Sequence, residues 1–276
     1  MSASFLDTMA AGSRERVARA RAQLSDTALR ERCQALPAPS PLRLSPARFD
    51  LIAELKLRSP AAGQLARGAD DLADRVQTYA TAGAAAVSVL TEPSRFDGTL
   101  EHLLRAARAL QSAQVPAMRK DFLVDPYQVL EARAAGAGGV LIIVRMLSDE
   151  DCSRLIHCAQ QQGLFALIET FNETDIARAR ALLAQHRSAQ LLLGVNCRDL
   201  ATLEVVPGRL EQLVALLPGD VPRVAESGVG GARDAARVAA AGYDLALVGS
   251  ALMTGGNPHR LVGEMLTAGR AARGAP

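Results

Sequence analysis

The sequence predicts an α/β fold, a (β/α)8 TIM barrel with an N-terminal helical extension. From residue 49 onward, short runs rich in leucine and β-branched residues alternate with longer segments of helical spacing. The runs are continuously apolar, as in parallel strands covered by helices, and eight such units suit a chain of 276 residues. The competing doubly wound open sheet normally has a GxGxxG turn after its first strand, which "KLRSPAAGQL" (56–65) lacks. A closed barrel is therefore the prediction.

Each repeating unit combines a strand signal with a helix signal. The predicted strands are 51–56, 85–91, 115–120, 139–144, 165–170, 191–196, 222–227 and 245–250. Asp125 is an N-cap and Pro126 a first-turn proline, and the helix that they open ends at Gly136. Ser148 and Asn172 open the next two helices, with acidic residues where the helix dipole favours them. Strands and helices therefore alternate along the whole barrel segment.

The segment before the repeat has a different pattern. Residues 1–35 have the spacing of one or two amphipathic helices, and the proline-rich stretch "LPAPSPLRLSP" (36–46) suits an extended connection. These residues are too few for a domain of their own. We expect residues 1–48 to form an extension and connection that pack on a barrel of residues 49–276, as one domain overall.

Composition argues against several classes of function. The formal net charge is +2 and aromatic residues are only 3%, with no tryptophan, which speaks against a nucleic-acid partner. No apolar run approaches the roughly 20 residues that span a bilayer, so no membrane partner is expected. The four cysteines form no CxxC pair and the histidines no HExxH motif, which predicts no metal site. Without a signal peptide, the cytoplasm is the expected location.

Ionisable and amide side chains interrupt the apolar runs near their carboxyl ends, where barrel enzymes place their active sites. A single charge there is explained about as readily by a buried ion pair as by function. Several ends contributing acids, ammonium groups and an amide to one mouth favour acid–base chemistry, because such neighbours shift one another's pKa values. The residues are Glu54, Lys56, Lys120, Glu169, Asn196 and Glu226.

Two small-residue turns predict a phosphate site. "ESGVGGARD" (226–234) and "LVGSALM" (247–253) each place small residues between the seventh or eighth strand and the following helix. Backbone N–H groups at helix N-termini bind phosphate, and this is the common phosphate position in barrels. The predicted cradle consists of Ser227, Gly228, Gly249 and Ser250, with Ser59 as a further candidate.

Six blocks of the chain carry a family resemblance. They are "IAELKLRSPAAG", "VSVLTEPSRFDGTLEHL", "RKDFLVDPYQVLEARAAGAGGVLIIVRML", "LIETFNETDIARA", "GVNCRDLATLEV" and "VAESGV…VGSALM". In this order and at this spacing they resemble the indole-3-glycerol-phosphate synthase family, over residues 52 to 258. "FLDTMAAGSRERV" is similar to that family's helical N-terminal extension, which partly covers the active site.

The resemblance implies a reaction and catalytic roles. The phosphorylated substrate 1-(2-carboxyphenylamino)-1-deoxyribulose 5-phosphate would close to indole-3-glycerol phosphate in tryptophan biosynthesis, losing carbon dioxide and water without a cofactor or metal. Lys120 would protonate the ribulose carbonyl oxygen as the aromatic carbon attacks. Glu54, Lys56 and Glu169 would handle the later proton transfers and keep the lysines charged.

The resemblance also implies binding roles. Asn196 and Glu226 would orient the ribulose hydroxyls. Arg198 would approach the anthranilate carboxylate or brace a neighbouring group, and Phe96 would help wall the aromatic ring. Association with other tryptophan-pathway enzymes is a further expectation from the family.

Three positions depart from the family pattern. Ala61 and Ala62 stand in the loop after the first strand, where the family has a serine and usually a further polar residue. Thr99 replaces the usual serine, and Cys197 stands where asparagine or serine is common. None of these changes removes an expected acid, base or phosphate turn.

Two rival functions can be weighed. A barrel that binds phosphate without chemistry would not need the intact set of strand-end acids and lysines. Phosphoribosylanthranilate isomerase would need a cysteine base near the first strand and an aspartate acid at the sixth. Those strands carry Glu54 with Lys56, and Asn196. A synthase is the predicted function.

Overall fold

The computed structural model describes residues 4–46, 49–59, 63–64, 72–187, 190–200 and 202–274. The predicted boundary between extension and barrel, at residue 48, lies outside the described residues. Ala61 and Ala62 also lie outside them, and for Ser59 only the backbone is described. No helix in these ranges is both long and apolar enough to cross a bilayer.

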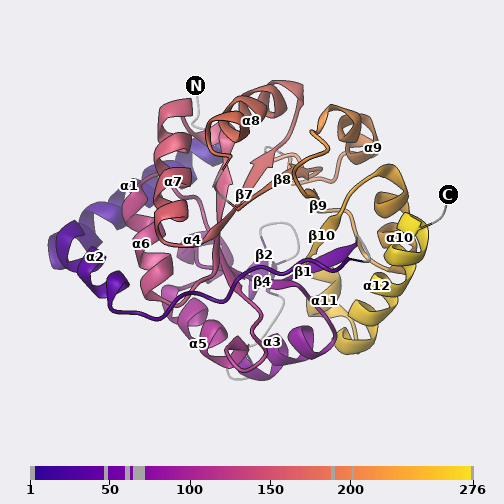
Figure 1. Cartoon of the computed structure of the whole chain (residues 1–276), viewed down its shortest axis with the longest axis horizontal. Coiled ribbons are helices and arrows are strands. Elements are labelled where there is room, and N and C mark those ends of the chain that lie inside the picture. Colours follow the sequence, from indigo (N-terminus) through magenta and orange to yellow (C-terminus); the bar gives the residue numbers. More distant parts are fainter. Residues whose placement is uncertain are drawn as a thin grey trace.

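Parallel strands close into a barrel, which confirms the predicted fold (Figure 1). They are β1 (Asp50–Leu55), β4 (Ala86–Leu90), β5 (Ala117–Lys120), β6 (Gly139–Ile143), β7 (Phe165–Thr170), β8 (Leu191–Asn196), β9 (Arg223–Glu226) and β10 (Leu245–Val248). β1 pairs with both β10 and β4, so Ala53 is in register with Val248 on one side and Val87 on the other. Each predicted strand lies within two residues of its observed bounds.

Helices surround the barrel (Figure 1). They are α3 (Leu72–Thr81), α4 (Pro93–Phe96), α5 (Leu100–Leu110), α6 (Pro126–Ala134), α7 (Asp149–Gln161), α8 (Glu173–Gln185), α9 (Arg209–Leu213), α10 (Ala232–Ala241), α11 (Ser250–Thr254) and α12 (Pro258–Gly274). Two 3-10 turns, η1 (Val144–Met146) and η2 (Val214–Leu216), and a small antiparallel ladder of β2 (Arg58–Ser59) and β3 (Gly63–Gln64) complete the set.

The predicted helix starts are confirmed by their caps. The Asp125 carboxylate accepts a hydrogen bond from the Tyr127 N–H at 2.8 Å, with Pro126 in the first turn. Ser148 and Asn172 cap α7 and α8 in the same way. The predicted end of α6 is confirmed as well, because Gly136 has a φ of +83°, a left-handed conformation that glycine adopts without strain.

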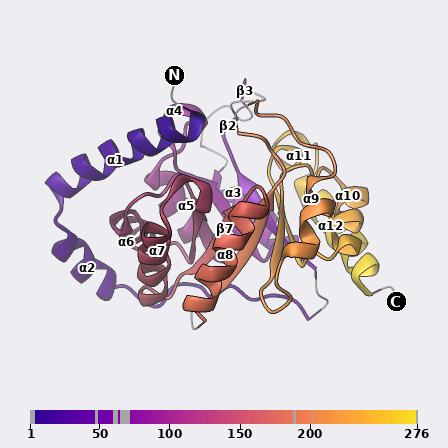
Figure 2. The same cartoon turned by 90° about the horizontal axis from the view of Figure 1, so that it is seen from above.

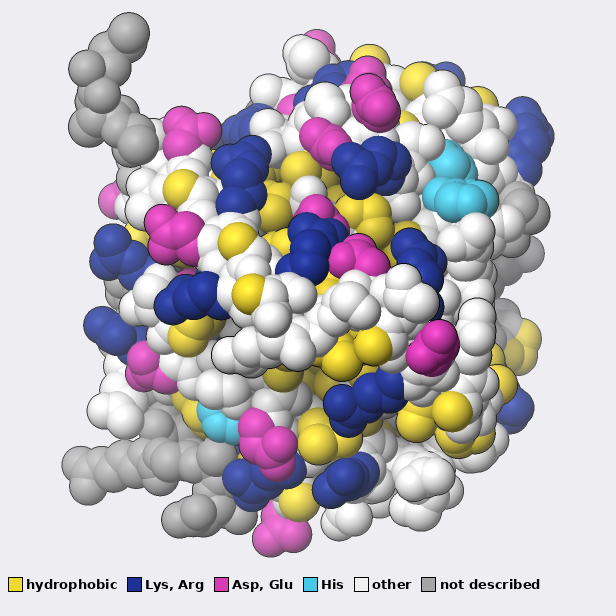
Figure 3. All heavy atoms as spheres, turned by 90° about the vertical axis from the view of Figure 1, so that its left-hand side faces the viewer, with side chains coloured by type: hydrophobic (Ala, Val, Ile, Leu, Met, Phe, Trp, Pro, Cys, Tyr) yellow, Lys and Arg dark blue, Asp and Glu magenta, His cyan; other side chains and the backbone are white. Residues whose placement is uncertain are grey.

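The N-terminal segment forms α1 (Phe5–Gln23) and α2 (Asp26–Gln34), which lie against the outside of the barrel beside α6 (Figures 1 and 2). A capping box between Ser4 and Asp7 opens α1. Figure 2 shows the first turns of α1 beside α4, toward the barrel end that carries β2 and β3. The extended chain after α2 crosses the opposite end of the barrel, where the Arg133 guanidinium donates to the Pro37 carbonyl at 2.6 Å. Basic and acidic side chains are interspersed on the face that carries α1 and α2 (Figure 3).

The strand period of two residues sorts side chains into two cores. Ile52, Met118 and Leu167 belong to the cluster inside the barrel, whereas Leu51 and Ala53 pack outward against the helices. The same alternation decides which polar residues at the strand ends can reach the barrel mouth.

Candidate active site

A cavity of about 420 Å³ opens at the carboxyl ends of the barrel strands. Nearly all of the residues that the sequence singled out line it together. They are Glu54, Lys56, Phe96, Lys120, Glu169, Asn196, Arg198, Glu226, Ser227, Gly228, Gly249 and Ser250. Ser59 is the exception, because its side chain lies outside the described part of the structure. Convergence of residues from distant parts of the chain is thus observed for every candidate that can be placed.

Lys120 reaches the cavity because of its position on β5. Met118, two residues earlier, belongs to the inner core, so Lys120 also points inward. Arg119 points the other way and is buried outside the barrel, where its guanidinium contacts Asp121 at 3.1 Å and Glu131 at 3.0 Å. The charged run in "PAMRKDF" (116–122) therefore serves two different sites, one on each side of the strand.

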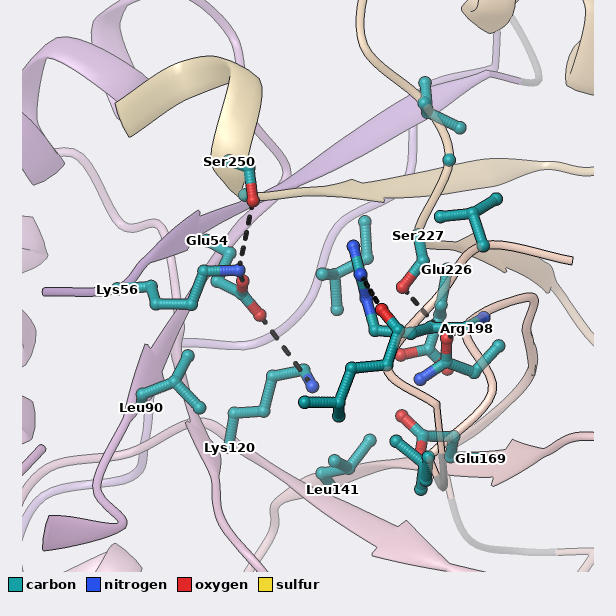
Figure 4. A pocket seen from close by; sticks show the side chains of 18 of the residues that line it. Glu54, Lys56, Leu90, Lys120, Leu141, Glu169, Arg198, Glu226, Ser227 and Ser250 are labelled. Atoms are coloured by element: carbon teal, nitrogen blue, oxygen red, sulfur yellow. Dashed lines mark hydrogen bonds and ion pairs between the residues drawn. The ribbon is translucent and has the colours of Figure 1, made fainter. Parts of the chain in front are cut away.

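Glu54 binds both lysines of this site (Figure 4). Its Oε1 atom lies 2.8 Å from Nζ of Lys56, and its Oε2 atom lies 3.8 Å from Nζ of Lys120. The Lys56 ammonium group also donates to the Ser250 hydroxyl at 3.4 Å, at the start of α11. Lys56 and Lys120 are, moreover, the only lysines in the sequence, which otherwise uses arginine for its permanently basic side chains.

Mutual pairing keeps this cluster charged. Burial acts to raise the pKa of Glu54, but the ammonium groups of Lys56 and Lys120 outweigh it and hold that pKa below its ordinary value. Burial acts to lower the pKa of Lys120, and the carboxylates of Glu54, Glu169 and Glu226 outweigh it and raise that pKa. Lys120 is therefore an ammonium group, able to donate a proton into the cavity.

Glu169 and Glu226 form a carboxyl pair across the cavity from Glu54 (Figure 4). Burial, followed by the neighbouring Glu169, raises the pKa of Glu226 well above its ordinary value of 4.5. Both carboxyl oxygens of Glu226 and Oε2 of Glu169 are buried without a donor from the described residues. A proton on Glu226 relieves this, because its hydroxyl can then donate to Glu169.

Two glycines make room for the carboxylates. A Cβ atom at Gly194, on β8, would collide with Oε1 of Glu226, and one at Gly249 would collide with Oε1 of Glu54. Gly249 is predicted to bind phosphate, which stays a prediction, and the structure shows that it has this steric role. Gly194 lay unnoticed within an apolar run, and no single-sequence pattern marks it.

Asn196 and Arg198 organise the segment after β8. The Asn196 side-chain oxygen accepts a hydrogen bond from the Ser227 hydroxyl at 2.9 Å and another from the backbone N–H of Arg198 at 3.0 Å. The Arg198 guanidinium donates to the Leu203 carbonyl at 2.5 Å, and its charge acts on both Glu54 and Lys120. Figure 4 shows Arg198 beside Ser227 and Glu226.

The two small-residue turns lie beside this cluster. Ser227 and Gly228 both have left-handed φ angles, +67° and +69°. α10 begins after Gly231 and α11 after Gly249, and neither helix has a side-chain cap, so N–H groups of their first turns have no acceptor within the helix. Such N–H groups favour an anion.

An apolar wall that sequence reasoning largely missed faces the charged groups. Phe5, Phe122, Leu200 and Leu203 line the cavity beside Phe96. The ring centroid of Phe122 lies 5.8 Å from that of Phe5 and 6.2 Å from that of Phe96. Phe122 could have been inferred, because it follows Lys120 by two residues. Phe5 belongs to the extension that was expected to cover part of the active site, but its contact with Phe122 is decided only by the tertiary structure.

The described departures from the family pattern are structurally mild. The Thr99 hydroxyl accepts from the His102 N–H at 3.1 Å and caps α5, as a serine would. Cys197 is buried under Gly228, and burial raises the pKa of its thiol. Among the described residues, no group of three or more histidine, cysteine, aspartate or glutamate side chains is arranged to hold a metal ion.

Comparison with known proteins gives one consistent answer. Residues 6–265 match the family model of indole-3-glycerol phosphate synthase. Curated relatives with that name include one from Parafrankia sp. (44% identical, covering 90% of this chain and 89% of the relative) and one from Mycolicibacterium smegmatis (41%, covering 97% and 96%).

Solved structures support the fold. A 3-hexulose-6-phosphate synthase from Salmonella typhimurium superimposes with a TM-score of 0.60 at 16% identity, covering 79% of this chain and 97% of that one. A tryptophan synthase chain from M. tuberculosis gives 0.56 at 16% identity, covering 83% and 98%. At such low identity these two likenesses concern the barrel alone.

Proposed function

The chain belongs to the indole-3-glycerol-phosphate synthase family of carboxy-lyases, which act in tryptophan biosynthesis, and we propose that the clustered strand-end residues carry out its reaction. The observation that supports this most is the placement of both lysines of the chain, Lys56 and Lys120, around the single carboxylate of Glu54. An ammonium group is compact and can lose its proton, whereas a guanidinium group cannot at ordinary pH. A chain that otherwise uses only arginine keeps lysine where a transferable proton is needed.

Ring closure requires a proton donor. The carboxylate-bearing aromatic carbon of 1-(2-carboxyphenylamino)-1-deoxyribulose 5-phosphate attacks the ribulose carbonyl, whose oxygen becomes negatively charged. Lys120 is the donor that we assign to this oxygen, because its raised pKa keeps it protonated before the reaction. Loss of carbon dioxide then leaves its electron pair in the six-membered ring, which becomes aromatic again, and the product of this step is a hydroxyl-bearing indoline.

The later steps move protons and expel water. Glu54 holds the Lys56 ammonium group within reach of the Ser250 hydroxyl. Lys56 can therefore stabilise negative charge on the hydroxyl that leaves, and it can exchange a proton with Glu54. Because the pKa of Glu226 is raised, a proton on Glu226 is available to a hydroxyl that leaves as water. When the water has left, a ring proton passes to one of the neighbouring carboxylates, and the product is indole-3-glycerol phosphate.

Binding is assigned to the surrounding groups. The phosphate would contact the N–H groups at the Ser227–Gly228 turn and at the Gly249–Ser250 start of α11. Asn196 and Glu226 would orient the ribulose hydroxyls, and Arg198 the anthranilate carboxylate. Phe96 would pack against the aromatic ring. Ser59 remains a candidate phosphate ligand from the sequence.

Substitution of Lys120 tests the assignment. The parent protein should convert the carboxyphenylamino sugar to a product with indole fluorescence, and Lys120→Ala should abolish this. Lys120→Arg is the matched control for charge: it keeps a cation beside Glu54 but should not restore turnover, because a guanidinium is a poor proton donor. Normal turnover by either variant would reject Lys120 as the essential acid.

Two wider assignments accompany this proposal. A cytoplasmic location agrees with four cysteines that are all buried as free thiols. Association with other tryptophan-pathway enzymes stays a prediction from the family.

A further inference from the structure

Asp121, the residue after Lys120, lines the cavity at the barrel mouth and is the centre of a buried hydrogen-bond network. Its side chain is fully buried and accepts from four donors. Its Oδ2 atom lies 2.8 Å from the Thr91 hydroxyl and 3.1 Å from Nη2 of Arg119. Its Oδ1 atom lies 2.7 Å from Nη2 of Arg16 and 2.8 Å from the Phe122 N–H. Arg16, on α1, is the donor from the extension.

The same helix holds the other side of the Phe122 backbone. The buried Ser13 hydroxyl donates to the Phe122 carbonyl at 2.5 Å, and Nη2 of Arg16 donates to that hydroxyl at 2.8 Å. Both backbone groups of Phe122 are therefore held by a network that contains Arg16. The Phe122 ring in turn packs edge-on against Phe5, at the start of α1. The segment that carries Lys120 and the aromatic wall is thus tied to α1 at two places.

Charge balance indicates that Arg16 fastens the middle of α1, whereas Arg21 holds its last turn through an ion pair with Asp125 at 2.8 Å. Three carboxylates meet here, Asp121, Glu92 and Glu131, whereas Arg119 contacts only the first and third. Glu92 is buried and lies 3.6 Å from Nη1 of Arg16. Removing one partner of a buried ion pair is costly because the remaining charge stays desolvated. Without Arg16, two buried carboxylates would lose their link to α1.

We propose that Arg16 is a positioning residue that couples the docking of α1 to the placement of Phe122 and Lys120, so that the cavity is complete only when α1 is docked. Arg16 does not line the cavity and acts through Asp121 and Ser13. The inference rests on the proposed role of Lys120. If α1 undocks more often, substrate must first redock it, which raises the apparent dissociation constant and leaves the fully bound enzyme intact.

The absence of tryptophan from the sequence allows a direct probe of docking. In a Phe5→Trp background the single indole would sit against Phe122, and its emission would report whether the first turns of α1 are docked. Arg16→Met is the test variant. Arg19→Met is the matched control, because Arg19 is exposed on the same helix.

In the Phe5→Trp background, Arg16→Met should shift the tryptophan emission to longer wavelength in the absence of substrate, and Arg19→Met should leave it unchanged. With the native Phe5 retained, Arg16→Met should raise KM about tenfold, the value of a lost charge-assisted hydrogen bond, with kcat nearly retained. Arg16→Lys keeps the charge but cannot contact Glu92 and Asp121 with two separate nitrogens, so it should give intermediate values in both measurements. It replaces Arg16→Met if that variant does not fold.

An unshifted emission in Arg16→Met would overturn the inference, as would a shift with unchanged KM or an equal effect of Arg19→Met. Normal turnover by Lys120→Ala would instead remove the proposed role of Lys120. It would leave the emission and KM effects of Arg16 in place, so the two failures are distinguishable.

Discussion

The Oε2 atom of Glu54, on β1, lies 3.8 Å from the ammonium nitrogen of Lys120, on β5, while Oε1 of the same carboxylate lies 2.8 Å from Lys56. One carboxylate thus contacts both lysines of the site, and Gly249 leaves just enough space for it. Activity and stability should therefore be sensitive to substitutions of Glu54 and of the residues that contact it.

Glu54→Gln should weaken both protein and reaction. Breaking a buried ion pair costs about 3–5 kcal/mol, because the lysines remain desolvated. The pKa of Lys120 should fall, since Glu54 contributes most to raising it. The alkaline limb of the kcat/KM profile should then move to lower pH, because the proposed mechanism needs the ammonium form of Lys120. An alkaline limb at the parent position would contradict this account.

Glu226→Gln should stabilise the protein at neutral pH while lowering activity. The pKa of Glu226 is raised in the folded protein. The contribution of Glu226 to the free energy of unfolding is therefore fully present below pH 4.5, and it is lost as the pH rises through the folded pKa. Glutamine stays neutral, so the variant's advantage in unfolding free energy should grow above pH 4.5 to about 1–2 kcal/mol. Urea unfolding across pH measures this.

Glu264→Gln is the control for Glu226→Gln, because Glu264 is exposed on α12 and its surface ion pair with Arg260 contributes little. Equal stability of Glu226→Gln and the parent at every pH would show that Glu226 is ionised and satisfied in the folded protein.

Gly249→Ala should lower kcat/KM by at least about tenfold, because its Cβ would displace Glu54 and with it the lysine contacts. Gly256→Ala is the matched control: a Cβ there meets no atom within 4 Å, so activity should be kept and stability should change by less than about 0.5 kcal/mol. Steady-state kinetics on both variants test the steric role, and equal activities would remove it.

Amine-directed modification should be unusually selective. Pyridoxal phosphate followed by borohydride reduction should label only Lys56 and Lys120, apart from the chain's amino terminus, because no other lysine exists. Activity should be lost in proportion to lysine labelling, and substrate should slow the loss. Peptide mass spectrometry locates the adducts, and full activity with both lysines labelled would contradict their proposed roles.

The sequence by itself determined the barrel and most of its mouth. Continuous apolar runs with helices between them specify parallel strands, and the period of two residues places Lys120 on the same side of β5 as Met118. Residues at the carboxyl ends of such strands must then gather at one end of the barrel. This is why the strand-end acids and the amide of Asn196 were predicted to lie together.

Only the tertiary structure decided which of these groups touch. Strand periodicity predicts the direction of a side chain but not its partner across the barrel. The position of Glu54 between the two lysines and the pairing of Glu169 with Glu226 therefore depend on strand register and on closure of the barrel. The space left by Gly194 and the contacts of α1 through Phe5 and Arg16 join residues far apart in the chain. Such contacts leave no local pattern, because they arise from packing of whole elements rather than from the order of neighbouring residues.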